Sequence, residues 1–143
     1  MKENHYTAEN VVTMHQCGQQ IVNDVSFPCV IYLNGSLGAG KTTLVQGIVQ
    51  HYNYHEIVSS PSYNLIHQYP VPEIDIAHLD LYRLEDPEEL IMLGLADLLT
   101  PNSLLLIEWP EKGQGFLPEA DIIINIEYQQ KPHVGRTIQV QFL

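Results

Sequence analysis

Basic residues are scarce in this chain of 143 residues. It has 17 aspartates and glutamates against 6 lysines and arginines, which gives a formal net charge of −11. The six bases are scattered along the sequence: Lys2, Lys41, Arg83, Lys112, Lys131 and Arg136. Since a stripe of cations is needed to neutralise a phosphate backbone, this composition argues against strong direct binding to nucleic acid. An acidic chain can still serve a nucleic-acid pathway by docking on a protein that carries the positive surface.

Cysteines and long apolar runs are also few. Cys17 and Cys29 have no metal-ligand spacing, so we expect buried free thiols in a reducing compartment. No run reaches the roughly 18 apolar residues of a membrane span, and the first residues lack a signal-peptide apolar region. We therefore expect a cytoplasmic protein. His51 and His55 could share a helix face and a metal, but no third ligand is evident, and we interpret them as surface residues.

What the chain does have is a glycine-rich loop in the right context. Residues 35–42 read Gly-Ser-Leu-Gly-Ala-Gly-Lys-Thr, the G-x-x-x-x-G-K-T pattern of phosphate-binding loops in nucleotide triphosphatases. An apolar run at 29–33 predicts a buried strand before the loop, and apolar residues spaced by three and four from Leu44 predict a helix after it. The backbone amides from Gly38 to Thr43 and the helix N-terminus would then face phosphate oxygens. Lys41 would reach the β- and γ-phosphates, and the Thr42 hydroxyl would bind magnesium.

The rest of the chain alternates between strand and helix patterns. We predict a helix from about Ala8 to Asp24 with Thr7 as its N-cap, although Gly18 makes this segment a poorer helix former. Another helix opens at Asp86-Pro87, is interrupted at Gly94 and ends by Pro101. Predicted strands lie at 62–69, 73–81, 104–107, 121–128 and 136–142, with hairpins joining the first two and the last two.

These elements predict an α/β protein with a P-loop NTPase-like, three-layer sandwich. Its mixed sheet would have a parallel core and antiparallel edge strands. The length predicts one domain over residues 1–143.

Two acids follow predicted strands and would lie near the nucleotide. Glu108 ends the run Leu104-Leu105-Leu106-Ile107, the usual setting of a Walker B acid, and Asp80 ends another strand. Because ligands of such sheets bind beyond the carboxyl ends of the strands, we predict that both acids serve magnesium or the attacking water. The alternatives are a solvated strand end for Glu108, and a structural cap or an ion pair with Arg83 for Asp80.

Several further residues could serve either function or structure. His78 could be a general base, but we favour a hydrogen-bonded structural histidine. Arg83 could stabilise transition-state charge or pair with Glu85 or Asp86. Trp109 is either plain core or a reporter of nucleotide-driven movement. The hydroxyls of Ser60 and Ser62, in the loop 59–63, suit a γ-phosphate sensor, with an ordinary proline loop as the alternative.

Four motifs, in the same order along the chain, resemble those of the TsaE family. These are the small bacterial ATPases needed for threonylcarbamoyladenosine modification of tRNA. The motifs are Gly35-Ser36-Leu37-Gly38-Ala39-Gly40-Lys41-Thr42-Thr43-Leu44, Ser60-Pro61-Ser62-Tyr63, His78-Leu79-Asp80-Leu81-Tyr82-Arg83-Leu84 and Ile107-Glu108-Trp109-Pro110-Glu111. The resemblance extends to Leu117-Pro118 and Gly135-Arg136.

The resemblance implies an ATPase that is weak alone and acts with two partners, the transferase TsaD and the scaffold TsaB, at adenosine 37 of tRNAs reading ANN codons. ATP turnover would reset or remodel that complex. It implies ATP and Mg²⁺ as cofactors, phosphate binding by Gly38, Ala39, Gly40, Lys41, Thr42 and Thr43, and magnesium ligation by Thr42 and Glu108. Asp80 would support hydrolysis and Arg136 would lie near the base or ribose.

This chain also departs from the family. Ser36 replaces the usual acid and Ser62 a common threonine, while Met14 or Thr13 stands where the first helix usually has a threonine. Two other functions stay open on the residues. One is a small-molecule kinase, although few bases and no evident lid are present, and the other is a nucleotide-dependent binding module with incidental hydrolysis.

Overall fold

A seven-stranded sheet organises the protein. The computed structural model describes residues 2–59, 61, 64–129 and 134–143. The strands are β1 Lys2–Ala8, β2 Cys29–Asn34, β3 Ile66–Pro70, β4 Asp75–Asp80, β5 Ser103–Glu108, β6 Ile122–Tyr128 and β7 Arg136–Phe142. The α-helices are α1 Val11–Val22, α2 Lys41–His51 and α3 Glu89–Met92, and two 3₁₀ helices are η1 Leu95–Leu98 and η2 Pro110–Gly113.

The strand order is β1-β7-β6-β2-β5-β4-β3. The four central strands β6, β2, β5 and β4 are parallel, whereas β7 and β1 on one side and β3 on the other are antiparallel to their neighbours. This arrangement confirms the predicted mixed sheet with a parallel core and antiparallel edges.

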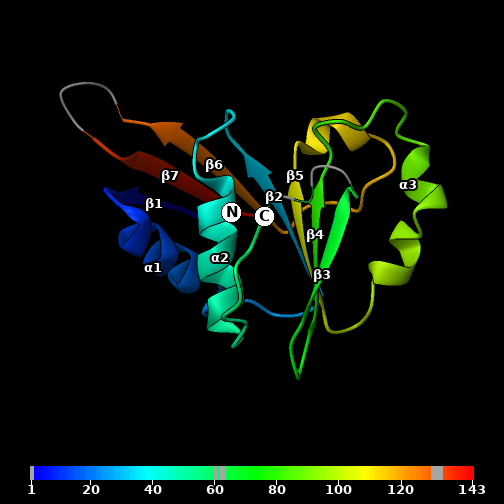
Figure 1. The fold of residues 1–143 in the computed structure, drawn as a ribbon, viewed down its shortest axis with the longest axis horizontal. Helices are drawn as coiled ribbons and strands as arrows, with labels where there is room; N and C mark the ends of the chain where they lie inside the picture. The colour runs from blue at the N-terminus through cyan, green and yellow to red at the C-terminus, as the bar shows by residue number, and fades with distance from the viewer. Residues whose placement is uncertain (1, 60, 62–63, 130–133) are drawn as a thin grey trace.

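Helical layers cover both faces of the sheet. Helices α1 and α2 lie side by side on one face, while α3 stands apart from them, beyond β5, β4 and β3 (Figure 1). The first core contains Met14, Ile48 and Leu106, and the second packs Leu90 and Leu95 against Leu105 on the opposite face. Strand β5 is buried along its whole length because it is covered from both sides, as the unbroken apolar run predicts.

The N-terminal segment differs from its prediction. Residues 2–8 form the edge strand β1, paired with β7 from Lys2 opposite Phe142 to Ala8 opposite Arg136. Helix α1 therefore begins at Val11, and its N-cap is Asn10 rather than Thr7. The Asn10 side chain accepts a hydrogen bond from the Thr13 amide at 2.9 Å, and the Thr13 hydroxyl accepts one from the Asn10 amide at 3.1 Å. This reciprocal capping box defines where the helix starts.

Glycines at the contact between α1 and α2 allow their backbones to approach closely. A Cβ added to Gly18 would lie 2.7 Å from the carbonyl oxygen of Leu44. A Cβ added to Gly47 would overlap the backbone of His15. Gly18 of α1, a poor helix former, is thus required for close packing against α2, the helix that follows the glycine-rich loop.

The third predicted helical stretch is interrupted at Gly94, as predicted. Helix α3 has only four residues, and Gly94, at φ 78°, separates it from η1. The Asp86 side chain still accepts a hydrogen bond from the Glu88 amide at 3.0 Å, which marks the start of this segment. No helix among the described residues is long and apolar enough to cross a membrane.

Candidate functional site

The glycine-rich loop connects β2 to α2 at the carboxyl end of the parallel strands. Gly40 is the N-cap of α2 at φ 110°, and Gly38 lies at φ 78°, both in the region that favours glycine. A Cβ added to Gly40 would also lie 2.9 Å from Cε of Met14. Glycine is therefore needed here for the loop to turn into the helix, whose first amides have no hydrogen-bond partners within the helix.

Lys41 is folded back into the loop and buried. Its Nζ donates a hydrogen bond to the Gly35 carbonyl oxygen at 2.7 Å and lies 4.1 Å from the centre of the Trp109 ring. Burial lowers the pKa of Lys41, while the carboxylates of Glu108 and Asp80 act in the opposite direction. The ammonium group is thus held by a neutral carbonyl oxygen and an aromatic ring. An anion in the cavity would bind it more strongly than either of these partners.

Two carboxylates lie side by side across from Lys41. Asp80 of β4 and Glu108 of β5 are register partners, with 6% and 3% of their surfaces exposed. Oε1 of Glu108 lies 3.9 Å from Nζ of Lys41, and Oδ1 of Asp80 accepts a hydrogen bond from the Tyr82 amide at 3.0 Å. Glu108 is therefore not a solvated strand end. Asp80 caps a turn and still faces the site.

These groups surround a cavity of about 320 Å³. It is lined by Leu37, Gly38, Gly40, Lys41, Thr42, Thr43, Asp80, Glu108 and Trp109. The structure thus brings together seven of the nine residues predicted for the site. Leu37 and Trp109 also line the cavity but were not among the nine, and the Leu37 side chain is largely exposed.

Ala39 and Arg136, the other two predicted residues, lie outside this cavity. Ala39 is fully buried and packs into the core below the loop. Arg136 binds the backbone of the loop, because its Nε donates a hydrogen bond to the Ala39 carbonyl oxygen at 2.9 Å. Its guanidinium also lies 3.9 Å from the centre of the Tyr128 ring. The Tyr128 hydroxyl donates to the Gly38 carbonyl oxygen at 2.7 Å, so two residues of the C-terminal hairpin hold the loop.

A second cavity of about 180 Å³ adjoins the other side of the loop. Gly40 and Thr43 border it together with Arg136, Gly135, Met14 and residues Ala8 to Val11. Arg136 thus lies where the helix N-terminus, β1 and α1 meet.

Several other predicted residues have defined places. His78 is fully buried, and its Nε2 lies 2.6 Å from Oε2 of Glu108. This agrees with a hydrogen-bonded histidine, although the partner was not expected. Trp109 has left-handed backbone angles, at φ 56°, which the sequence did not signal, and this turn directs its ring over Lys41.

The remaining predictions are not decided by the structure. Arg83 is exposed in the turn after β4 and is not among the described residues that line the cavity. Ser60 and Ser62 lie outside the described residues, so the γ-phosphate sensor stays a prediction. Among the described residues, no cluster of three potential metal-binding side chains includes His51 or His55.

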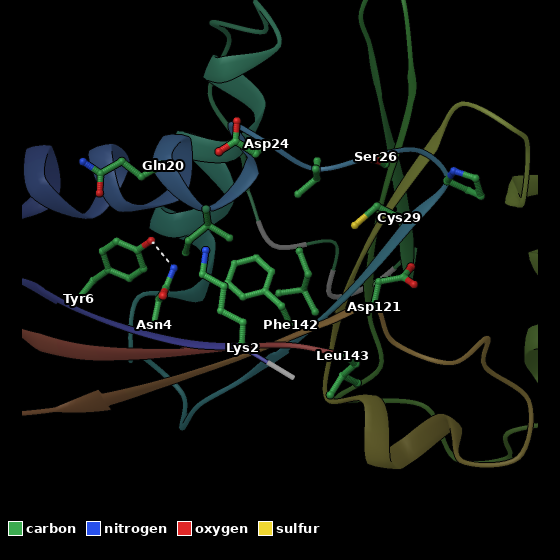
Figure 2. A pocket seen from close by; sticks show the side chains of 14 residues that line it. Lys2, Asn4, Tyr6, Gln20, Asp24, Ser26, Cys29, Asp121, Phe142 and Leu143 are labelled. Atoms are coloured by element: carbon green, nitrogen blue, oxygen red, sulfur yellow. Dashed lines mark hydrogen bonds between the residues drawn. The ribbon is translucent and has the colours of Figure 1, made fainter.

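A larger cavity of about 540 Å³ lies at the opposite end of the sheet (Figure 2). It is bordered by Lys2 and Tyr6 of β1, by Asp24 after α1, and by Cys29 and Asp121 at the amino ends of β2 and β6. Ligands of open α/β sheets bind beyond the carboxyl ends of the strands, so the smaller cavity is the candidate site.

The parallel core, the glycine-rich loop and the acids beside it define an α/β protein with a P-loop-like fold. The family model described as "Threonylcarbamoyl adenosine biosynthesis protein TsaE" matches residues 8–138. The chain belongs to the TsaE family.

Individual relatives agree with this assignment. A TsaE protein of Haemophilus influenzae is 54% identical over 99 residues, which cover 69% of this chain and 63% of that protein. A TsaE protein of Rickettsia bellii is 40% identical over 99 residues, covering 68% of each chain. The match thus spans less than two thirds of the length of the Haemophilus relative.

The fold also has a solved counterpart. A crystal structure of Bacillus subtilis YdiB superposes with a TM-score of 0.80 at 23% identity, covering 99% of this chain and 86% of that chain. At this identity the likeness concerns the fold.

Proposed function

We propose that this protein binds ATP with Mg²⁺ in the 320 Å³ cavity, hydrolyses it slowly, and serves the formation of threonylcarbamoyladenosine in tRNA. The observation that carries the proposal is the buried Lys41 between a glycine loop at a helix N-terminus and two adjacent buried carboxylates.

The loop fits a polyphosphate. Amides at the start of α2 lack partners within the helix, and together with the helix dipole they favour an anion. Lys41 would exchange the Gly35 carbonyl for β- and γ-phosphate oxygens, a stronger charge-assisted contact. Gly38 and Gly40 keep the approach free of side chains.

The acids fit a divalent cation. Asp80 and Glu108 place two buried carboxylates beside the same cavity as Lys41. Oxygen ligands of this kind suit Mg²⁺, which is normally bound by one or two protein groups together with phosphates and waters. Thr42 and Glu108 would hold the ion, and Asp80 would orient water. The bound ion would neutralise phosphate charge.

The second cavity suits the nucleoside. It borders Gly40 and Thr43, the part of the loop nearest to where the α-phosphate would lie, and Arg136 forms part of its wall. Met14 and Val11 offer apolar surface to a base. We therefore assign the base or ribose to this side, as first expected from Arg136.

The family and its relatives support the pathway. The family and the relatives are named for threonylcarbamoyladenosine biosynthesis. We propose that the protein acts with the transferase TsaD and the scaffold TsaB, and that ATP turnover resets or remodels their complex. The net charge of −11 suits a subunit that leaves tRNA to its partners.

Replacing the phosphate-binding lysine tests the proposal. Lys41→Ala should weaken ATP binding about 10- to 100-fold, because a charge-assisted hydrogen bond contributes about 1.5–3 kcal/mol. Lys112→Ala removes an exposed lysine of the same charge outside the cavity and should bind as the wild type does. Isothermal titration calorimetry measures both, and unchanged affinity in Lys41→Ala would contradict the phosphate assignment.

The same pair of variants tests the partners. Purified TsaD and TsaB should be retained by the immobilised wild-type protein and by Lys112→Ala in an ATP-dependent manner, and lost with Lys41→Ala. If TsaD and TsaB were retained equally with and without ATP, and equally by Lys41→Ala, docking would be independent of the nucleotide. That result would contradict the remodelling role.

A further inference from the structure

Three buried side chains form a continuous hydrogen-bonded chain behind the candidate site. The Tyr69 hydroxyl lies 3.0 Å from Nδ1 of His78, and Nε2 of His78 lies 2.6 Å from Oε2 of Glu108. Their exposed fractions are 5%, 0% and 3%. Glu108 lines the cavity, whereas Tyr69 and His78 are not among its described lining residues. The proposed function gives them no contact with ATP.

Sheet register produces this chain. Tyr69 of β3 is opposite Ile76, and His78 lies two residues beyond Ile76 on β4. His78 is opposite Leu106, and Glu108 lies two residues beyond Leu106 on β5. Side chains two residues apart share a face, so each link is a diagonal step across adjacent strands, towards the carboxyl ends of β4 and β5. The register of the strands thus directs one oxygen of Glu108 towards His78 on the neighbouring strand β4.

Proton positions along the chain follow from the partners. The 2.6 Å contact needs a proton between Nε2 and the carboxylate, because two acceptors would repel one another at that distance. A neutral imidazole carries one proton, so Nδ1 is then an acceptor, which suits the phenol O–H of Tyr69. Burial raises the pKa of Tyr69, which keeps the phenol protonated and able to donate.

We propose that Tyr69 and His78 are positioning residues for Glu108. His78, itself held by Tyr69, binds Oε2 of Glu108 and leaves Oε1 facing Lys41 and the cavity. Oε1 is the oxygen that lies 3.9 Å from Nζ of Lys41. An unheld glutamate would lose rotamer freedom when it took up this position, whereas here that entropy is lost during folding. This role rests on the proposed function, since it prepares Glu108 for the magnesium ion.

The first test uses the protein without nucleotide. Nitrogen-15 NMR of the histidine rings should show His78 with a protonated Nε2 and an unprotonated Nδ1. Tyr69→Phe keeps the ring and removes the donor to Nδ1, so the Nδ1 resonance should shift while Nε2, still bonded to Glu108, stays protonated. The matched control Tyr54→Phe removes a hydroxyl from a ring 5.0 Å from Tyr69 that is bonded instead to Glu56, and it should leave His78 unchanged. A His78 protonated on Nδ1 alone or on both nitrogens in the wild type would overturn the proposal.

The second test separates positioning from ATP binding. Tyr69→Phe and His78→Leu should bind ATP without Mg²⁺ within about threefold of the wild type, but should need about 10- to 100-fold more Mg²⁺ for half-maximal turnover, the usual effect of losing a partner of a metal ligand. His78→Gln keeps an N–H for Glu108 and should recover most of the loss. If His78→Leu does not fold, Tyr69→Phe decides, because its shape is conserved.

These readouts distinguish two failures. A wild type that binds no ATP would contradict the proposed function, whereas the tautomer measurement does not depend on nucleotide. Wild-type Mg²⁺ dependence in both Tyr69→Phe and His78→Leu would overturn the positioning role while leaving the ATP site in place.

Discussion

Lys41 and Glu108 show how single residues prepare this site. Both are buried, and each is held by a contact that a ligand does not need: Lys41 by the Gly35 carbonyl, and Glu108 by His78 through one oxygen only. One ammonium group and one carboxylate oxygen therefore remain directed towards the same small cavity. Preorganised charges of this kind stabilise a charged ligand without a further ordering cost.

Neutralising Glu108 tests its part in turnover. Glu108→Gln keeps the size of the side chain and an oxygen for His78, so ATP should still bind within a few-fold of the wild type. Hydrolysis should fall by about 100-fold or more, since the buried carboxylate would be lost from the reaction site. Phosphate release under saturating ATP measures this. Turnover at the wild-type rate would remove Glu108 from the mechanism.

Some of these residue roles follow from the sequence and others do not. The glycine loop, Lys41 and Thr42 can be predicted because strand, loop and helix are consecutive in the chain. Asp80 and Glu108 can be predicted because they end apolar runs. The link from Glu108 to His78 and Tyr69 cannot, because it depends on the register of three strands that meet only in the folded protein. The left-handed turn at Trp109 has no glycine to announce it.

At the scale of elements, the contact between α1 and α2 is the one most sensitive to a single atom. Alanine normally stabilises a helix relative to glycine by up to about 1 kcal/mol. At Gly47 the added Cβ would overlap the His15 backbone, which can be relieved only by moving the helices apart.

Gly47→Ala should therefore lower the free energy of unfolding by about 1–3 kcal/mol, the usual cost of overpacking. Gln16→Ala, on the exposed side of α1, should stay within about 0.5 kcal/mol of the wild type. Urea unfolding compares the two. A more stable Gly47→Ala protein would show that the helices have room to spare.

The elements also show where sequence patterns are insufficient. Central strands and α2 follow apolar runs and spacing, so their positions agree with prediction. Strand β1 is largely polar and sits at an edge, where pairing with β7 rather than burial determines its structure. Its absence from the prediction moved the expected start of α1 to Ala8, although the capping box at Asn10 and Thr13 is readable in the sequence.

At the scale of the whole molecule, burial of weak acids makes stability depend on pH in the alkaline range. Burial, with a smaller effect of Asp121, raises the pKa of Cys29 from 9.0 to about 12. Burial, with a smaller effect of Cys29, raises the pKa of Tyr52 from 10.0 to about 12. Because the folded-state values exceed the unfolded ones, the unfolded chain releases these protons first.

Stability should consequently be constant with respect to these two groups below about pH 8 and fall as the pH rises through 9 and 10. Each group contributes a slope of at most about 1.4 kcal/mol per pH unit. In Cys29→Ala the decline should begin nearer pH 10, where Tyr52 starts to ionise in the unfolded chain. Urea unfolding between pH 7 and 10.5 measures this, and a flat profile in the wild type would disprove it.

The fold brings the glycine-rich loop and the two buried acids together at the carboxyl ends of the parallel strands. Two cores support one sheet, and the carboxyl ends of β2, β4 and β5 deliver the loop and both acids to the same cavity. The C-terminal hairpin holds the loop through Arg136 and Tyr128, so residues about 90 or more positions apart in the sequence meet at the loop.

A crystal structure with Mg²⁺ and a non-hydrolysable ATP analogue tests the central claim most directly. We predict that the triphosphate lies against the amides from Gly38 to Thr43, with Lys41 released from the Gly35 carbonyl and the metal ion beside Thr42 and Glu108. A nucleotide bound elsewhere, or a metal ion with Glu108 turned away from it, would contradict the account.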